Sequence, residues 1–334
     1  MHLGITYTLK DQSLAAASAG TDDRQEEFDS PETVDALARV FEGLGHRVHK
    51  LGDGRSLIQR LLADPPDFVF NFAEGRGTSR SREAWVPAIL EMLSIPYAGS
   101  DPLTLAVTLD KPVAKTLVAA AGVATPAGWT LTGEPTETWL SEVECRLPVI
   151  VKPAWEGSSK GIRRRCLVTR AADLRAVLEE VRAQYKQPLL VEEFIAGDEI
   201  TVGVIGNAPP KVIGLLHVVP LKPSEHFIYS LEVKREYAAN VRYASPPEVA
   251  ATACAEIESA ALKAYTALGC RDIARIDFRL RDGVPYFLEV NPLPGLNPTT
   301  GDLVILARFN GYSYEQLIEA VLTAALVRVG LKKA

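Results

Sequence analysis

Residues 274–292 read ARIDFRLRDGVPYFLEVNP, two runs of alternating apolar and polar side chains on either side of an Asp-Gly turn signal. Alternation with a period of two is typical of β-strands, so this stretch predicts a β-hairpin. Each strand has two polar side chains on one of its faces: Arg275 and Asp277 on the first strand, and Glu289 and Asn291 on the second. Two carboxylates and an amide form the oxygen-rich ligand set that Mg²⁺ prefers. The pattern predicts a magnesium site, although a charged solvent-facing sheet would explain either strand taken alone.

The turn of this hairpin decides whether the two polar faces meet. A two-residue turn at Asp282-Gly283 in a regular hairpin would put Asp277 and Glu289 on opposite faces. A three-residue turn, Arg281–Gly283 with the glycine left-handed, restores a shared face, and a β-bulge has the same effect. We expect the three-residue turn, because a metal site requires an odd-length turn or a bulge.

Two further segments have the composition of a nucleotide site. Residues 152–161, KPAWEGSSKG, offer a strand-end lysine and the backbone N–H groups of a small-residue turn to phosphate oxygens. No helix opens at a Gly-Lys-Ser/Thr, so this is not the Walker pattern, and an ordinary hairpin turn has the same composition. The acidic strand end VEEFIAGDE, residues 191–199, could offer backbone groups to adenine and a carboxylate to ribose. Each segment indicates nucleotide binding only in combination with the others.

The order of predicted elements indicates an α/β protein. Strands at 3–8, 46–51 and 67–72 alternate with helices at 30–44 and 56–62, which predicts a doubly wound parallel sheet. The later strands are predicted to be antiparallel, at 199–206, 211–219, 272–280 and 284–291.

Three domains are expected: an N-terminal α/β domain at 1–101, a central one at 102–192, and a C-terminal one with the metal and acceptor sites at 193–334. The polar segment 220–246 carries no predicted element, as is typical of a lid or binding loop.

Composition excludes several classes of function. The chain has 334 residues, of which 47% are hydrophobic and 23% charged, as expected of a soluble protein with two or three domains. A net charge of −6 argues against a nucleic-acid partner. The four cysteines are scattered without a C-x-x-C, and no apolar run reaches membrane-spanning length. We expect a cytoplasmic protein with reduced thiols and small-molecule partners, and a homodimer is possible.

Taken in order, these segments resemble the ATP-grasp superfamily and, within it, the D-alanine–D-alanine ligase family, over about residues 85–317. The matching segments are Ile95-Pro96-Tyr97-Ala98-Gly99-Ser100, Leu109-Asp110-Lys111, Val151-Lys152-Pro153, Glu156-Gly157-Ser158-Ser159, Val191-Glu192-Glu193, Arg275-Ile276-Asp277 and Leu288-Glu289-Val290-Asn291. The resemblance implies an ATP-grasp fold and an ATP- and magnesium-dependent ligase. Such an enzyme activates a carboxylate as an acyl phosphate and joins it to an amine.

The resemblance also implies roles for individual residues. Lys111 and Lys152 would hold the nucleotide phosphates, and the loop 157–161 would close over the γ-phosphate. The phosphate loop would include Glu156, Gly157, Ser158 and Ser159, and Lys234 or Arg235 would also reach the phosphates. Adenine would bind at Glu192, Glu193 and Ile195, and ribose at Glu199. Two Mg²⁺ ions, or Mn²⁺, would be held by Asp277, Glu289 and Asn291, and the oxyanion of the tetrahedral intermediate would be stabilised by Arg275.

The substrate side departs from the family pattern. The family's glycine-rich N-terminal segment, with the glutamate that grips the first amino acid, is not recognisable in residues 1–29, and the loop 292–302 lacks the family's Ser-Leu. The candidate substitutes are Glu74 or Glu83 for an ammonium, Arg80 or Arg82 for a carboxylate, and Asn297, Thr299 and Thr300 for the acceptor. A solvated helix start would explain each of the glutamates and arginines equally well. We expect a ligase with altered substrates. The alternatives are true D-alanine–D-alanine synthesis, an ATP-grasp small-molecule kinase, and a nucleotide-binding module without turnover.

Overall fold

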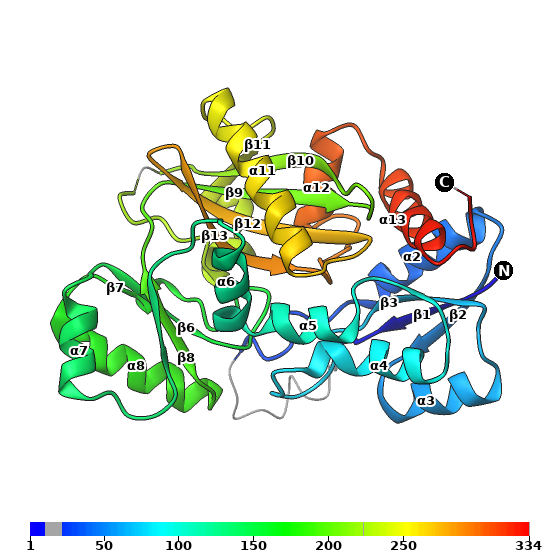
Figure 1. Ribbon diagram of the computed structural model, residues 1–334, viewed down its shortest axis with the longest axis horizontal. Helices are drawn as coiled ribbons and strands as arrows, with labels where there is room; N and C mark the ends of the chain where they lie inside the picture. The colour runs from blue at the N-terminus through cyan, green and yellow to red at the C-terminus, as the bar shows by residue number, and fades with distance from the viewer. Residues whose placement is uncertain (11–21, 223, 334) are drawn as a thin grey trace.

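The computed structural model describes residues 1–10, 22–222 and 224–333. The protein is built on three β-sheets (Figure 1). The first is a four-stranded parallel sheet with the strand order β2-β1-β3-β4. Its strands are β1 (His2–Tyr7), β2 (Arg47–Gly52), β3 (Phe68–Phe72) and β4 (Tyr97–Ala98). Helix α2 (Pro31–Gly43) packs on one face, and α3 (Gly54–Ala63) and α4 (Trp85–Met92) pack on the other. The predicted doubly wound parallel sheet is therefore confirmed.

Helix α2 shows why the local sequence folds as predicted. The Ser30 hydroxyl accepts a hydrogen bond from the Thr33 N–H, and proline at the first helical position has the required φ. Its buried stripe includes Val34, Leu37 and Phe41. The helix thus begins and ends within two residues of the predicted bounds.

The second sheet is antiparallel with the order β5-β8-β6-β7. Its strands are β5 (Gly128–Leu131), β6 (Val149–Pro153), β7 (Leu167–Val168) and β8 (Leu189–Glu193). Helices α7 (Glu137–Glu144) and α8 (Ala171–Tyr185) cover one of its faces. The strand expected near 165–168 is shorter, because the 3₁₀ helix η2 (Arg164–Cys166) occupies its first part.

The third sheet has five antiparallel strands in the order β11-β10-β9-β12-β13. These are β9 (Asp198–Ile205), β10 (Lys211–Pro220), β11 (Val241–Ala244), β12 (Ile273–Arg281) and β13 (Val284–Asn291). Helices α6 (Lys111–Ala120) and α11 (Ala251–Ala267) pack on one face, and α12 (Asp302–Phe309) and α13 (Tyr314–Arg328) pack on the other (Figure 1). Because α13 also contacts α2 and β4, one hydrophobic core joins the first sheet to the third. The division at residues 101 and 192 stays a prediction.

The β12–β13 hairpin corrects one expectation. Its turn is the two-residue Asp282-Gly283, with φ of 53° and 78°, and Arg281 lies opposite Val284. The predicted three-residue turn is wrong, because two consecutive positive φ angles form the tight hairpin turn that Asp-Gly favours. The alternative is confirmed: the register shifts so that Leu288 is an extra residue, and Asp277 lies opposite Glu289.

The segment 220–246 corrects a second expectation, namely that it contains no helix or strand. It contains the short helices α9 (Leu231–Arg235) and α10 (Tyr237–Asn240), and it ends in β11, which pairs with β10. Although the segment is polar on average, its residues Tyr229, Val233 and Val241 form a small apolar cluster with Val218 of β10. The remaining elements are α5 (Pro102–Leu109) and η1 (Arg82–Ala84). Among the helices of the described residues, none is long and apolar enough to span a membrane.

Candidate active site

A cleft of about 690 Å³, here called the sheet cleft, lies between the second and third sheets. Its lining includes many of the predicted nucleotide and metal residues: Lys152, Ser159, Glu192, Glu193, Ile195, Glu199, Lys234, Asp277 and Glu289. Residues assigned to one nucleotide from distant parts of the sequence therefore surround one cavity.

The candidate metal ligands share one face of β12 and β13. The Asn291 side-chain amide lies between the two carboxylates, with Nδ2 3.4 Å from Asp277 Oδ2 and 3.5 Å from Glu289 Oε1. Arg275 crosses the same face and donates to Asp277 Oδ2 at 2.9 Å. Two carboxylates and an amide, which can present its oxygen, fit the preference of Mg²⁺ for oxygen ligands. The shared face predicted from the sequence is confirmed.

Lys111 connects these carboxylates to the glycine-rich loop. Asp110 caps α6 by accepting from the Val113 N–H at 3.3 Å, which fixes Lys111 at the first helical position. The Lys111 ammonium lies 3.3 Å from Glu289 Oε2 and donates to the Glu156 carbonyl. Burial alone would raise the pKa of Glu289, but nearby cations, Lys111 first among them, outweigh burial and lower the pKa to about 2. Glu289 therefore carries its negative charge at every physiological pH.

A buried carboxylate holds Lys152 in place. Glu192 is 1% exposed and forms ion pairs with Lys152 and, at 3.1 Å, with Lys115. Burial favours the neutral acid, but the two lysines outweigh it and keep the pKa of Glu192 below its usual range. Lys115 was not predicted as a site residue. The available signal was its spacing, since it lies four residues after Lys111 on the same helix and hence on the same face.

Arg279 is a second residue that the sequence reasoning missed. Its guanidinium donates to the Ile195 carbonyl at 2.9 Å and to Glu199 at 3.1 Å, and lies over the Phe194 ring at 4.7 Å. It therefore positions three residues of the sheet cleft at once. The alternation that placed Arg275 and Asp277 on one face, continued by one step, would have included it.

The loop 157–161 is held in an unusual backbone conformation. Ser158 and Ser159 have φ of 49° and 59°, which residues other than glycine rarely adopt. Ser159 lines the sheet cleft, whereas Ser158 lines the two clefts described below. Strained backbone of this kind is concentrated at functional sites.

Residues 22–29 tie this loop to the rest of the protein, and we call them the acidic strap. Glu27 accepts from Lys160 at 3.0 Å and from Arg82 at 3.0 Å, and the Gly161 N–H donates to Asp23 at 3.0 Å. Sequence reasoning found no role for this stretch, because its acidic residues show no periodicity and their partners are remote in the chain.

A second cavity, the inner cleft, adjoins the metal ligands. It is lined by Glu74, Glu83, Lys111, Glu156, Gly157, Ser158, Arg275, Glu289 and Asn291, together with residues 292–295. Burial, with neighbouring carboxylates, raises the pKa of Glu74 well above its usual range. Burial also raises the pKa of Glu83 to about 7, although Arg82 opposes it. Two predicted ammonium ligands therefore face one cavity that also contains the candidate oxyanion residue Arg275.

The two candidate arginines lie elsewhere. Arg82 is 1% exposed rather than solvated, and its guanidinium is already occupied by Glu27, by Glu156 and by the Trp155 carbonyl. Arg80 is exposed, pairs with Asp110 at 3.4 Å and lines none of the clefts described here among the described residues.

The outer cleft, of about 1,310 Å³, continues from the inner one between the acidic strap and the loop before α12. Asn297 and Thr300 line it, whereas Thr299 is exposed and bonds to the Asn297 side chain at 2.8 Å. Lys234 lines both the outer and the sheet clefts, while Arg235 lines only the outer one and pairs with the strap at Asp22 and Glu26. Of the two basic residues, Lys234 is thus the one placed to reach both clefts.

Comparison with known proteins gives a consistent result. A family model described as the D-ala D-ala ligase C-terminus matches residues 117–323. The D-alanine–D-alanine ligase of Moorella thermoacetica is 32% identical over 87% of this chain and 92% of the relative. That of Carboxydothermus hydrogenoformans is 33% identical over 88% and 92%. An uncharacterized protein, y4sG, of Sinorhizobium fredii is 35% identical over 87% of each chain.

Solved structures share the fold. The D-alanine–D-alanine ligase from Bacillus anthracis complexed with ATP aligns with a TM-score of 0.74 at 23% identity, over 99% of this chain and 100% of that one. The VanG D-Ala:D-Ser ligase from Enterococcus faecalis aligns with a TM-score of 0.71 at 22% identity, over 97% and 100%. The expected ATP-grasp fold is confirmed.

Proposed function

The chain belongs to the D-alanine–D-alanine ligase family of ATP-dependent ligases, and we propose that it joins a carboxylate to an amine, with substrates other than two molecules of D-alanine. The observation that carries the ligase function is the alignment of Asp277 with Glu289 across the bulged hairpin, with Arg275 and Lys111 beside them. This arrangement gathers oxygen ligands and cations around the space where a γ-phosphate and an attacking carboxylate can meet.

Residues of the sheet cleft and of the adjoining inner cleft have places in this chemistry. The base would lie between apolar side chains such as Ile150 and Leu288, with ribose at Glu199. Lys111 and Lys152 would hold the phosphates, and Asp277, Glu289 and Asn291 would hold magnesium. A magnesium ion held there would supply charge neutralisation at the transferring phosphoryl group.

The remaining steps use the residues of the inner cleft. A substrate carboxylate attacks the γ-phosphate and becomes an acyl phosphate, while ADP leaves. The amine then attacks the acyl carbon, and Arg275 stabilises the oxyanion of the tetrahedral intermediate before phosphate departs. The loop 157–161 and the acidic strap would exclude water, which otherwise hydrolyses an acyl phosphate.

The ammonium site of this proposal is supported by two carboxylates without partners. Within the described ranges, neither Glu74 nor Glu83 has a hydrogen-bond or ion-pair partner for its side chain, although Glu83 is buried, Glu74 is partly buried and both line the inner cleft. Burying an uncompensated carboxylate is unfavourable, and a substrate ammonium would compensate it. We assign the ammonium of the activated amino acid to this pair, and the acceptor to the outer cleft near Asn297 and Thr300. A cytoplasmic location and a homodimer remain predictions.

The test is a phosphate-release and ADP-release screen with magnesium, ATP and amino acids, alone and in pairs. Phosphate release that requires both an acid and an amine supports the ligase. ADP formed without free phosphate would instead support a small-molecule kinase, and no turnover with any pair would favour a binding module.

A further inference from the structure

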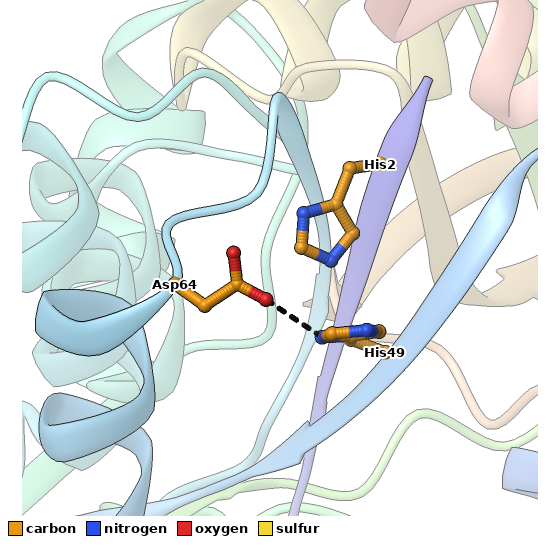
Figure 2. A group of neighbouring side chains, drawn as sticks. All are labelled: His2, His49 and Asp64. Atoms are coloured by element: carbon orange, nitrogen blue, oxygen red, sulfur yellow. Dashed lines mark ion pairs between the residues drawn. The ribbon is translucent and has the colours of Figure 1, made fainter.

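A group of possible metal-ligating side chains lies at the amino end of β1 in the first sheet, away from the active site. His2, His49 and Asp64 each offer one possible ligand atom, and these atoms all lie within 4.8 Å of one another. The two imidazole rings pack edge to face, with their centroids 4.1 Å apart. Figure 2 shows the three side chains turned toward one another from β1, from β2 and from the residue that follows α3. The group is not explained by the ligase function.

The fold brings these residues together in a defined way. In the parallel pairing of β1 with β2, His2 lies opposite Arg47 and Gly4 lies opposite His49. His2 and His49 are therefore diagonal neighbours on one face of the sheet. Asp64 approaches the same face because α3 ends there, with its last turn closed by the Asp64 N–H to the Arg60 carbonyl at 2.9 Å.

The separations suit a bridging cation better than direct hydrogen bonds. His49 Nδ1 is 3.8 Å from Asp64 Oδ2, which is too long for a hydrogen bond. Two ligand atoms about 2.1 Å from a tetrahedral zinc ion lie about 3.4 Å apart, so side-chain rotation has to close separations of up to 4.8 Å to this value. His2 Nε2 is buried and has no hydrogen-bond partner in the described part of the chain. A buried ring nitrogen without a partner, beside a second imidazole and a carboxylate, is a position that a metal ion would satisfy.

Two of the cations near the group are engaged elsewhere. Lys50 pairs with Asp35, and Arg60 donates to the Leu51 carbonyl at 2.8 Å.

We propose that His2, His49 and Asp64 form a binding site for a divalent transition-metal ion, with Zn²⁺ as the best fit and a water molecule as the fourth ligand. Two imidazoles and one carboxylate select zinc, nickel or cobalt over magnesium, which prefers oxygen ligands alone. The site is structural: it joins the starts of β1 and β2 to the end of α3. It lies at the amino end of β1, about 17 Å along the strand from Tyr7, at about 3.3 Å per residue.

The test measures zinc binding by the full-length protein without a histidine tag. Isothermal titration with ZnCl₂ is done in saturating Mg²⁺, to occupy the candidate magnesium ligands, and without ATP, because ATP itself chelates zinc. The expected result is one zinc ion per chain and a rise in the unfolding temperature. His49→Ala and Asp64→Ala should each weaken zinc binding by at least about tenfold, since even the loss of an outer partner of a metal ligand costs 10- to 100-fold.

The control is His46→Ala, which removes a histidine that lies near this edge but outside the group. It should bind zinc as the unmodified protein does, and all three variants should keep ligase activity in the absence of zinc. Cobalt substitution should give the visible absorption of a tetrahedral ion in the unmodified protein and lose it in His49→Ala. The proposal is overturned if the unmodified protein binds no zinc under these conditions, or if His49→Ala and Asp64→Ala bind it as tightly as His46→Ala.

Discussion

Replacing Glu83 with glutamine should stabilise the free protein and weaken its activity at the same time. Glu83 is 6% exposed, and burial raises its pKa from 4.5 to about 7 despite the opposing charge of Arg82. When folding raises a carboxyl pKa, the stability gained from the protonated form is present at low pH and is lost as pH rises through the raised value. The difference between 4.5 and about 7, at about 1.36 kcal/mol per pH unit, corresponds to about 3 kcal/mol lost above pH 8.

Glu83→Gln removes this pH-dependent cost. The free energy of unfolding should rise by up to about 3 kcal/mol at pH 8.5, but by only about 1 kcal/mol at pH 5, where the native carboxyl is protonated. Urea unfolding at both pH values, followed by tryptophan fluorescence, measures the difference. Glu142→Gln, a change of the same kind at an exposed position on α7, is the matched control and should show no such pH dependence.

Activity should change in the opposite direction. If Glu83 binds a substrate ammonium, its loss removes a charged hydrogen bond of about 1.5–3 kcal/mol, so kcat/KM should fall about 10- to 150-fold. In the unmodified enzyme kcat/KM should rise with pH through about 7, as Glu83 ionises, and this rise should be absent in the variant. Equal stabilisation at pH 5 and 8.5, together with unchanged kcat/KM, would refute the reasoning.

Three further predictions follow from the same geometry. Asp277→Asn should abolish turnover by removing a metal ligand, and near-normal rates in saturating magnesium would contradict that role. Glu192→Gln removes the carboxylate that pairs with two buried lysines and should lower the free energy of unfolding by about 3–5 kcal/mol. Adding Lys115→Met should recover part of this loss in chemical unfolding. Additive losses from the two substitutions would refute the coupling between Glu192 and Lys115. Glu27→Gln should loosen the loop around Ser158, so amide exchange there should increase without nucleotide, and unchanged protection would count against the acidic strap as its anchor.

The sequence predicted the features of this protein that depend on local periodicity. Alternation placed Asp277 and Glu289 on adjacent strands, but it could not decide between a three-residue turn and a bulge, because the pairing of β12 with β13 selects among several locally allowed turns. The contacts of Glu27 with Arg82 and Lys160 join residues 55 and 133 positions apart, so no local pattern could indicate them.

Composition gave wrong predictions where a few apolar residues were sufficient to form structure. Segment 220–246 is polar on average, yet Tyr229, Val233 and Val241 pack with Val218 and order two short helices and an edge strand. Arg82 was expected either to bind a substrate carboxylate or to lie in a solvated helix start. It is buried instead, because other segments of the chain converge on its guanidinium. Such convergence is a property of tertiary packing alone.

The most direct test of the proposed function compares D-alanine alone with paired substrates in one phosphate-release assay. Under ATP and magnesium, D-alanine alone should give kcat/KM well below about 10⁴ M⁻¹s⁻¹, the lower end for ordinary enzymes. A different acid and amine should turn over together, with phosphate released only when both are present. Efficient phosphate release with D-alanine alone, at about 10⁴ M⁻¹s⁻¹ or more, would contradict the account and show that the pocket around Glu74 and Glu83 serves the family's usual substrate.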